Sequence, residues 1–398
     1  MLPTAKDDTI YLDHAATTPV DPQVLQIMLP YFTQQFGNPS SLYRLGQEGR
    51  AALDRARSSV ARTLGCIPSE IVFTGGATES DNLAIEGVAW RRRRLQGDAP
   101  APHIVTTSIE HHAVLHPAQS LQQRGFTVTF AAPNEHGVVP AERVIAAIRP
   151  ETCLISVMYA NNETGAIQPV AEIGRIARER GIPFHVDAVQ AAGALPLRVD
   201  DIGCDLLSLS AHKFYGPKGV GVLYIRRDTP IDFVQQEGGG QEEGRRGGTE
   251  NVPGIVGLSA ALEKAEHLRE AYVTHCSGLR DRMEEALFAA IPDAQLNGPR
   301  DRALRLPGHL NVAIPGVQGE TALLSLDMQG VAASAGSACT TGNAEPSHVL
   351  MAMGASEERS RASLRFSLGR DTTADDVDEA VDILIETVER VRELAGAR

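Results

Sequence analysis

The stretch that decides the fold is IPFHVDAVQAAGALPLRVDDIGCDLLSLSAHKFYGPKGVGVLYI, residues 182–225. It holds three short apolar runs, at residues 182–186, 206–209 and 220–225, which polar or glycine-rich connections separate. Runs of this length and composition are typical of buried β-strands. Charged residues follow the first two runs, so the ends of these two strands are candidate sites for chemistry.

The same alternation of short apolar runs and longer helical patterns covers residues 70–260. Four more runs precede the quoted stretch, at residues 70–73, 103–106, 126–130 and 153–159. Seven strands interleaved mostly with helices predict an α/β domain around a largely parallel, seven-stranded sheet. In such sheets, ligands bind beyond the carboxyl ends of the strands.

Beyond Pro253 the pattern changes to one long helix, expected from about Gly254, followed by strands at residues 310–314, 331–333 and 364–368. This order predicts a second, smaller α+β domain. The last helix is marked by a capping box and by one apolar face. The box consists of Thr373 and Asp376, and the face of Val377, Val381, Leu384, Val388 and Val391. We predict a large domain at 15–260 and a small domain built from 1–14 and 261–398.

Length and composition describe a globular protein of two or three domains. The chain has 398 residues, of which 42% are hydrophobic and 22% charged. Its net charge of −13 disfavours nucleic acid and anionic membranes as partners. The 5 cysteines are an odd number without a CxxC pair, which is typical of a reducing compartment. The start of the chain lacks the pattern of a signal peptide, and no run approaches a membrane span, so we expect a cytoplasmic protein.

A candidate phosphate site lies at VFTGGATES, residues 72–80. The segment predicts a strand, a glycine turn and the start of a helix. Unpaired amides at a helix N-terminus bind anions, and glycines allow a close approach. The same pattern also ends many strands that bind no ligand, so both interpretations stay open here.

Asp187 and Lys213 strengthen the ligand interpretation. They lie 213 − 187 = 26 residues apart, a gap that holds one crossover, so their strands are expected to lie close together with both residues at one edge. Alone, Asp187 also fits a helix cap, and Lys213 fits a surface lysine in a glycine-rich loop. Together with the phosphate cradle they meet the needs of pyridoxal phosphate: a lysine for the Schiff base, an acid for the pyridine nitrogen and a site for the phosphate.

Seven segments carry a resemblance to a known family. They are YLDHAATTP (11–19), FGNPSS (36–41), GATESDN (76–82), NNETG (161–165), SAHK (210–213), SAGSAC (334–339) and RFSLGR (365–370). In this order they resemble the cysteine desulfurases of the NifS/IscS type, which are pyridoxal-phosphate enzymes with the aspartate-aminotransferase fold. The match runs from the first strand to the last helix.

The resemblance implies roles for individual residues. Lys213 would hold pyridoxal phosphate, Asp187 would pair with the pyridine nitrogen, and Gln190 would bond the phenolic oxygen. His111 would stack on the ring and move protons. The phosphate ligands so implied are Ala77, Thr78, Ser210, His212 and, from the partner subunit of a homodimer, Thr249. The implied substrate site contains Asn162, which also contacts the cofactor, Arg365 for the substrate carboxylate, and Asn38 in a flanking segment.

Two further groups of residues bear on the chemistry. His112 and His116 have the spacing of zinc ligands on a helix, but nothing completes a metal site, and we expect none. Cys339 lies among small polar residues at about 334–346, a loop that we expect to be mobile and to carry the sulfur. The remaining cysteines are interpreted as apolar fillers. They are Cys66, Cys153, Cys204 and Cys276.

The resulting hypothesis is conversion of L-cysteine to L-alanine, with sulfur passing to Cys339 as a persulfide. An acceptor protein such as an iron–sulfur scaffold, or a thiolation pathway, would then take the sulfur. One alternative is a selenocysteine lyase or another pyridoxal-phosphate lyase of the same fold, in which Cys339 is incidental. Another is a sulfur-relay or scaffold protein without catalysis. The sequence leaves open the acceptor and the group that activates Cys339.

Overall fold

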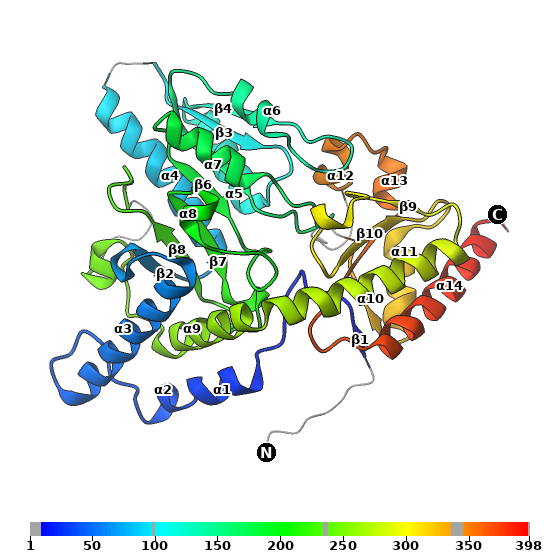
Figure 1. Cartoon of the computed structure of the whole chain (residues 1–398), viewed down its shortest axis with the longest axis horizontal. Coiled ribbons are helices and arrows are strands. Elements are labelled where there is room, and N and C mark those ends of the chain that lie inside the picture. The colour runs from blue at the N-terminus through cyan, green and yellow to red at the C-terminus, as the bar shows by residue number, and fades with distance from the viewer. Residues whose placement is uncertain (1–8, 98–99, 234–237, 336–344, 397–398) are drawn as a thin grey trace.

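A seven-stranded sheet forms the centre of the molecule (Figure 1). The computed structural model describes residues 9–97, 100–233, 238–335 and 345–396. The strand order is β2-β8-β7-β6-β5-β3-β4, and only β8 runs antiparallel to its neighbours. The strands are β2 (Ile71–Thr74), β3 (His103–Thr107), β4 (Thr127–Ala131), β5 (Thr152–Met158), β6 (Phe184–Asp187), β7 (Leu206–Ser210) and β8 (Gly221–Ile225). Each of the seven predicted runs supplies one strand, and the predicted α/β sheet is confirmed.

Helices cover both faces of this sheet, because successive side chains of a strand point to opposite sides. In β2, Val72 packs into one core while Ile71 and Phe73 pack into the other. The first core lies under α4 (Ala77–Gln96) and α5 (His112–Gln123). The opposite face is covered by α3 (Arg44–Leu64), α6 (Ala141–Ala146), α7 (Val170–Glu179), α8 (Val199–Ile202) and α9 (Val252–His267).

A smaller α+β unit lies beside the large sheet, on the right in Figure 1. Its three-stranded antiparallel sheet consists of β12 (Ser363–Ser367), β10 (His309–Ala313) and β9 (Gln295–Leu296), and β1 (Ile10–Tyr11) pairs in parallel with β11 (Val331–Ala332). Its helices are α10 (Arg269–Ala290), α11 (Gly319–Asp327), α12 (His348–Ala352), α13 (Glu357–Arg361) and α14 (Ala374–Gly396). Apart from α12 and α13, these elements share a core of their own, whereas Val349 of α12 packs into the core of the large sheet. The exact division into 15–260 and 1–14 plus 261–398 stays a prediction.

The capping box predicted for α14 is confirmed. The amide of Asp376 donates to Thr373 Oγ1 at 3.1 Å, and the amide of Thr373 donates to Asp376 Oδ2 at 2.8 Å. Four residues of the predicted face are buried in the core of the smaller unit, namely Val377, Val381, Leu384 and Val388. The capping box and the heptad-like apolar face were therefore sufficient to predict this helix from the sequence.

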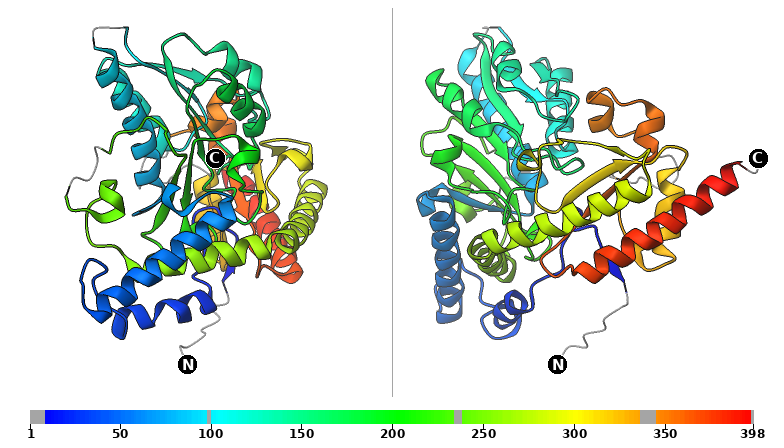
Figure 2. Two further views of the ribbon diagram at one scale, coloured as in Figure 1. Left: turned by 60° about the vertical axis from the view of Figure 1, so that its left-hand side comes forward. Right: turned by 45° about the vertical axis from the view of Figure 1, so that its right-hand side comes forward.

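The single long helix expected beyond Gly254 is two helices. α9 begins at Val252, and the chain breaks at Leu268 (φ −91°, ψ 0°) before α10 starts, with neither glycine nor proline at the break. Figure 2 shows α10 running on from α9 towards the smaller unit. The short helices α1 (Pro22–Met28) and α2 (Pro30–Thr33) pack beside α9. In the described part of the chain, no helix is long and apolar enough to cross a membrane.

Candidate active site

An open cleft of about 1190 Å³ lies at the carboxyl ends of the central strands. Most of the predicted site residues line it: Ala77, Thr78, His111, Asn162, Asp187, Gln190, Ser210, His212, Lys213 and Arg365. Asn38 and Thr249 do not line the cleft and are exposed elsewhere on this chain. Cys339 lies outside the described residues. Topology thus brings together the residues that follow β5, β6 and β7, as expected for an α/β sheet.

One end of the cleft is the N-terminus of α4. Gly76 is its N-cap, with φ +153°, and no side chain caps the first amides of the helix. The start of β8 approaches so closely that a Cβ on Gly221 would lie 2.7 Å from the Gly76 backbone. Ser210 ends the neighbouring strand, and its Oγ faces this turn. Uncapped amides with a nearby hydroxyl form an anion site that suits a phosphate.

The floor of the cleft holds Asp187 at the last position of β6. Its Oδ1 accepts the amide of Val189 at 3.0 Å, and the side chain is buried. Burial, and then the neighbouring carboxyl of Asp81, raise the pKa of Asp187. In the described part of the chain it forms no ion pair with lysine or arginine. A buried carboxyl with this environment fits a ligand that brings a protonated ring nitrogen.

Lys213 lies in a short 3₁₀ turn, Ala211–Lys213, directly after β7. Because β6 and β7 pair in parallel, Asp187 and Lys213 emerge at the same edge of the sheet, as predicted. The Lys213 Nζ donates to the carbonyls of Ala15 and Ala16 at 2.6 and 2.8 Å. Burial, with a contribution from the charge of Arg365, lowers the pKa of Lys213 to about 8. Such an amine is a nucleophile near neutral pH.

His111 directly precedes α5 and lines the cleft. Its Nδ1 accepts the amide of Ala113 at 3.1 Å, which places the ring proton on Nε2. Desolvation by the cleft walls, and then the charge of Lys213, lower the pKa of His111 to about 4. Its imidazole is therefore neutral at pH 7. The same two causes lower the pKa of His212 to about 4, and its Nδ1 lies 3.1 Å from Thr17 Oγ1.

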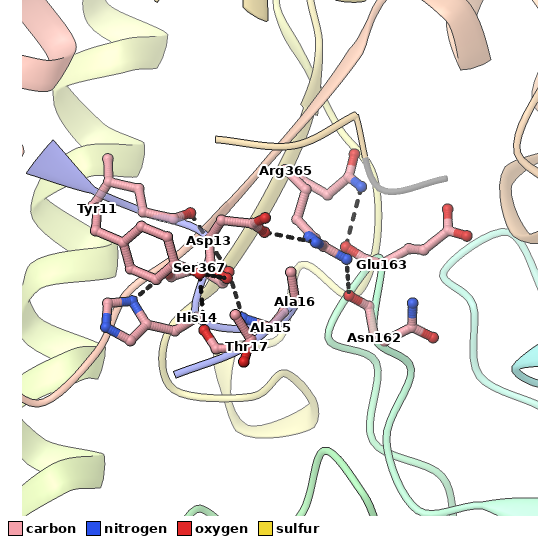
Figure 3. Close-up of polar contacts among 12 residues, drawn as sticks. Tyr11, Asp13, His14, Ala15, Ala16, Thr17, Asn162, Glu163, Arg365 and Ser367 are labelled. Carbon is pink, nitrogen blue, oxygen red and sulfur yellow. Dashed lines mark hydrogen bonds and ion pairs between the residues drawn. The ribbon is translucent and has the colours of Figure 1, made fainter. Parts of the chain in front are cut away.

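Arg365, on β12, reaches the cleft from the smaller unit (Figure 3). Its Nη2 lies 2.7 Å from Asp13 Oδ1, and its Nη1 donates to the carbonyl of Asn162 at 2.9 Å. The Nε is buried and has no partner among the described residues. The guanidinium is thus held from both sides at the cleft, where its positive charge suits a carboxylate ligand.

The match to a family follows from the sequence as a whole: residues 10–380 match the model of the class-V aminotransferases. The chain belongs to this family. It is 46% identical over 386 residues to a protein of Clostridium botulinum strain Hall named cysteine desulfurase IscS, covering 97% of this chain and 96% of that protein. The recognition of a NifS/IscS-type member is confirmed.

Solved structures of the family agree with this fold. A NifS-like protein superposes with a TM-score of 0.89 at 37% identity, covering 96% of this chain and 100% of that one. SspA in complex with cysteine superposes with a TM-score of 0.77 at 38% identity, covering 91% and 99%. The predicted architecture therefore has a direct counterpart in the solved NifS-like protein.

Sequence reasoning missed a group of buried ionisable residues beneath the cleft. Asp81, Glu110 and His185 have almost no exposure. The ring of His185 contacts Ser156 Oγ through Nδ1 at 2.9 Å and Ser208 Oγ through Nε2 at 3.0 Å. Burial raises the pKa of Asp81 and, to about 8, that of Glu110. The available signals were an acid within the helix pattern, Asp81, and a histidine within an apolar strand run, His185; Glu110 lies in the turn between β3 and α5, where no pattern marks it.

The histidines that raised the question of a metal site pack against one another. The rings of His112 and His116 are stacked, with centroids 4.7 Å apart and planes at 8°, and His348 lies 4.9 Å from His112. Within the described ranges, no group of three or more histidine, cysteine or acidic side chains is placed to hold a metal ion. The expected absence of a metal stays a prediction.

Proposed function

We propose that this chain is a pyridoxal-phosphate-dependent cysteine desulfurase. It converts L-cysteine to L-alanine and passes the sulfur to Cys339 as a persulfide. The observation that carries the proposal is the convergence of Lys213, Asp187 and the uncapped N-terminus of α4 in one cleft. The class-V family membership and the relative named cysteine desulfurase IscS support it, as does the similar SspA structure with cysteine.

The described residues fit the cofactor at each of its functional groups. The amides of Ala77 and Thr78, with Ser210 and His212, would hold the phosphate, and Thr249 of a second subunit would complete this site. Asp187 offers the ring nitrogen a buried carboxyl without a cation. When bound, pyridoxal phosphate supplies the electron sink that stabilises negative charge at the substrate α-carbon.

The chain's own residues supply the binding and proton transfers. Lys213 anchors the cofactor and, when its amine is free, takes the substrate α-proton, which its lowered pKa of about 8 allows near neutral pH. The neutral imidazole of His111 would pack against the ring and carry a proton. The amide of Gln190 would bond the phenolic oxygen. Its Nε2 now donates to the Ala15 carbonyl at 3.0 Å, next to Lys213.

Substrate is positioned from the other side of the cleft. The guanidinium of Arg365 would bind the substrate carboxylate, while Asp13 and Asn162 hold it in place. Asn38 lies in a segment that would flank the substrate. The proposed oligomer is a homodimer, in which Thr249 of the second subunit would reach the phosphate.

Sulfur transfer balances without an external oxidant. The Cys339 thiolate attacks the substrate sulfur, so the carbon–sulfur bond breaks and a sulfur–sulfur bond forms. L-cysteine and one enzyme thiol thus give L-alanine and one persulfide. We propose that the persulfide then passes to an acceptor protein such as an iron–sulfur scaffold, and that the enzyme works in the cytoplasm.

The test is to give the purified, cofactor-loaded protein L-cysteine and a thiol reductant and to quantify alanine and sulfide. We expect equal amounts of both, and no turnover by the Lys213→Ala or Cys339→Ala variants. A protein that is yellow with cofactor but inert towards L-cysteine contradicts the substrate assignment and leaves the cofactor site standing. Cys339→Ala with undiminished turnover of L-selenocysteine identifies a selenocysteine lyase instead.

A further inference from the structure

A second cavity, of about 280 Å³, lies where α9 meets α10. Three residues, Ala15, Gln190 and Lys213, line both this cavity and the cleft, and they form the wall between them. The remaining lining comes from both units of the fold, including Leu268 at the break between the two helices. The cavity therefore lies behind the proposed anchor lysine and does not belong to the site described above.

The lining of this cavity is mainly small and apolar. Ala194, Ala261, Ala265, Leu306, Pro307 and Leu368 contribute to it. Protein interiors are normally close-packed, so a space of this size is suited to an occupant. An apolar cavity of about 150 Å³ binds benzene, and in proportion about 280 Å³ accommodates a molecule of about eleven non-hydrogen atoms.

Two of the three cations in the lining, Lys264 and Arg370, pair with its one carboxylate, Asp21. Lys264 Nζ and Arg370 Nη2 lie 2.8 and 2.6 Å from Asp21 Oδ2, and these two partners hold the pKa of Asp21 down at about 2. Arg370 also pairs with Asp371 at 3.3 Å and stacks over the ring of Tyr215 at 4.0 Å. The third cation of the lining, Lys213, lies in the wall shared with the cleft and donates to the carbonyls of Ala15 and Ala16. In the cofactor-loaded protein its amine would hold the cofactor, so a charged ligand would enter an apolar space without a free counter-charge.

One polar group of the lining is left without a partner. His309, the first residue of β10, is 8% exposed, and its Nε2 makes no hydrogen bond among the described residues. Burial lowers the pKa of His309 to about 3, so the ring is neutral. Buried polar atoms are nearly always paired. A hydroxyl both donates and accepts, and it therefore pairs with Nε2 in either tautomer of the ring.

We propose that this cavity is a binding site for a neutral amphiphile, an alkylphenol or similar alcohol of about ten non-hydrogen atoms, whose hydroxyl bonds His309 Nε2. Ala271 and His275 at its rim are exposed and mark the entrance. The apolar body of the ligand packs against the alanines of α9. This inference does not depend on the reaction proposed for the cleft.

The test is calorimetric titration of the cofactor-loaded protein with 4-propylphenol, and with propylbenzene as the matched compound without a hydroxyl. We expect saturable one-to-one binding of the phenol, about fivefold tighter than that of propylbenzene. 4-Propylbenzoate is expected to bind more weakly than either. Absence of saturable binding, equal affinities for the first two compounds, or tighter binding of the benzoate overturns the proposal.

Variants locate the site. His309→Phe keeps the shape of the side chain and removes Nε2, so the affinities for 4-propylphenol and propylbenzene become equal. Ala265→Leu fills the cavity and abolishes binding of both. The matched control is Ala286→Leu on α10, where the alanine is exposed and does not line the cavity, and binding stays unchanged.

Two further measurements exclude trivial explanations. Thermal unfolding of each variant establishes that it is folded. If Ala265→Leu does not fold, the comparison of 4-propylphenol with propylbenzene on the His309→Phe variant still tests the proposal. Displacement of 4-propylphenol by L-cysteine or by free pyridoxal phosphate places the probe in the cleft and overturns the assignment. Phenol affinity that persists in a folded Ala265→Leu variant does the same.

Discussion

Two groups of the predicted site residues behave differently in this chain. Lys213, Asp187 and the start of α4 meet in one cleft, whereas Asn38 and Thr249 are exposed away from it. The first group follows the ends of neighbouring strands, and the pairing of a sheet brings such residues together by geometry alone. The second group lies in loops that no pairing directs. Most of the proposed cofactor ligands thus come from one chain, and we propose that Thr249 completes the phosphate site from a second chain.

The strongest test of the first group is Lys213→Ala. Loss of the anchoring amine is expected to lower kcat/KM for alanine formation by more than about 10³-fold. Lys213→Arg keeps the positive charge but not the nucleophilic amine, and we expect it to fail equally. Substantial turnover by the arginine variant contradicts the anchoring role. It would mean that only the positive charge of Lys213 is needed. Alanine release and the visible absorbance of bound cofactor are the measurements.

The fold and the first group could be read from the sequence because both follow from local patterns. Each apolar run became one strand, and the 26-residue gap between Asp187 and Lys213 (213 − 187) held one crossover. The burial of Asp81 and His185 was not foreseen, since it depends on how α4 packs over the sheet. The pairing of Arg365 with Asp13 joins residues 352 positions apart, beyond any local pattern.

The floor of the cleft offers a matched pair of acids. Asp187→Asn removes the negative charge opposite the ring nitrogen, and we expect kcat to fall by about 10²- to 10³-fold. Asp81→Asn changes a neighbouring buried carboxyl whose Oδ1 lies 3.5 Å from His185 Nε2 and which we do not assign to the ring nitrogen, so we expect a change below about threefold. Both are measured as steady-state alanine formation with saturating cofactor. Equal losses in the two variants contradict the assignment of Asp187 alone to the ring nitrogen.

The pH dependence of cofactor uptake probes Lys213 itself. Burial disfavours the charged form of its amine, so the pKa of about 8 lies below the ordinary lysine value. The neutral amine is the reactive form, and the fraction of Lys213 in this form increases with pH. Uptake by the cofactor-free protein is therefore expected to accelerate about thirtyfold from pH 6.5 to pH 9 and to level off above the pKa. Stopped-flow absorbance gives the rates; a rise that continues without a plateau to pH 10 contradicts the lowered pKa.

The smallest expected effect tests the second group, and it asks which chain supplies Thr249. Thr249→Val removes one hydroxyl donor to a charged phosphate and is expected to weaken cofactor binding about tenfold. In a mixed dimer, one chain carries Lys213→Ala and the other carries Thr249→Val. The only site with a lysine then belongs to the Thr249→Val chain, and its threonine comes from the partner. If Thr249 acts across the interface, this site binds cofactor with wild-type affinity, one equivalent per dimer. Affinity as weak as that of the Thr249→Val homodimer places the threonine in its own chain's site and removes this reason for a dimer.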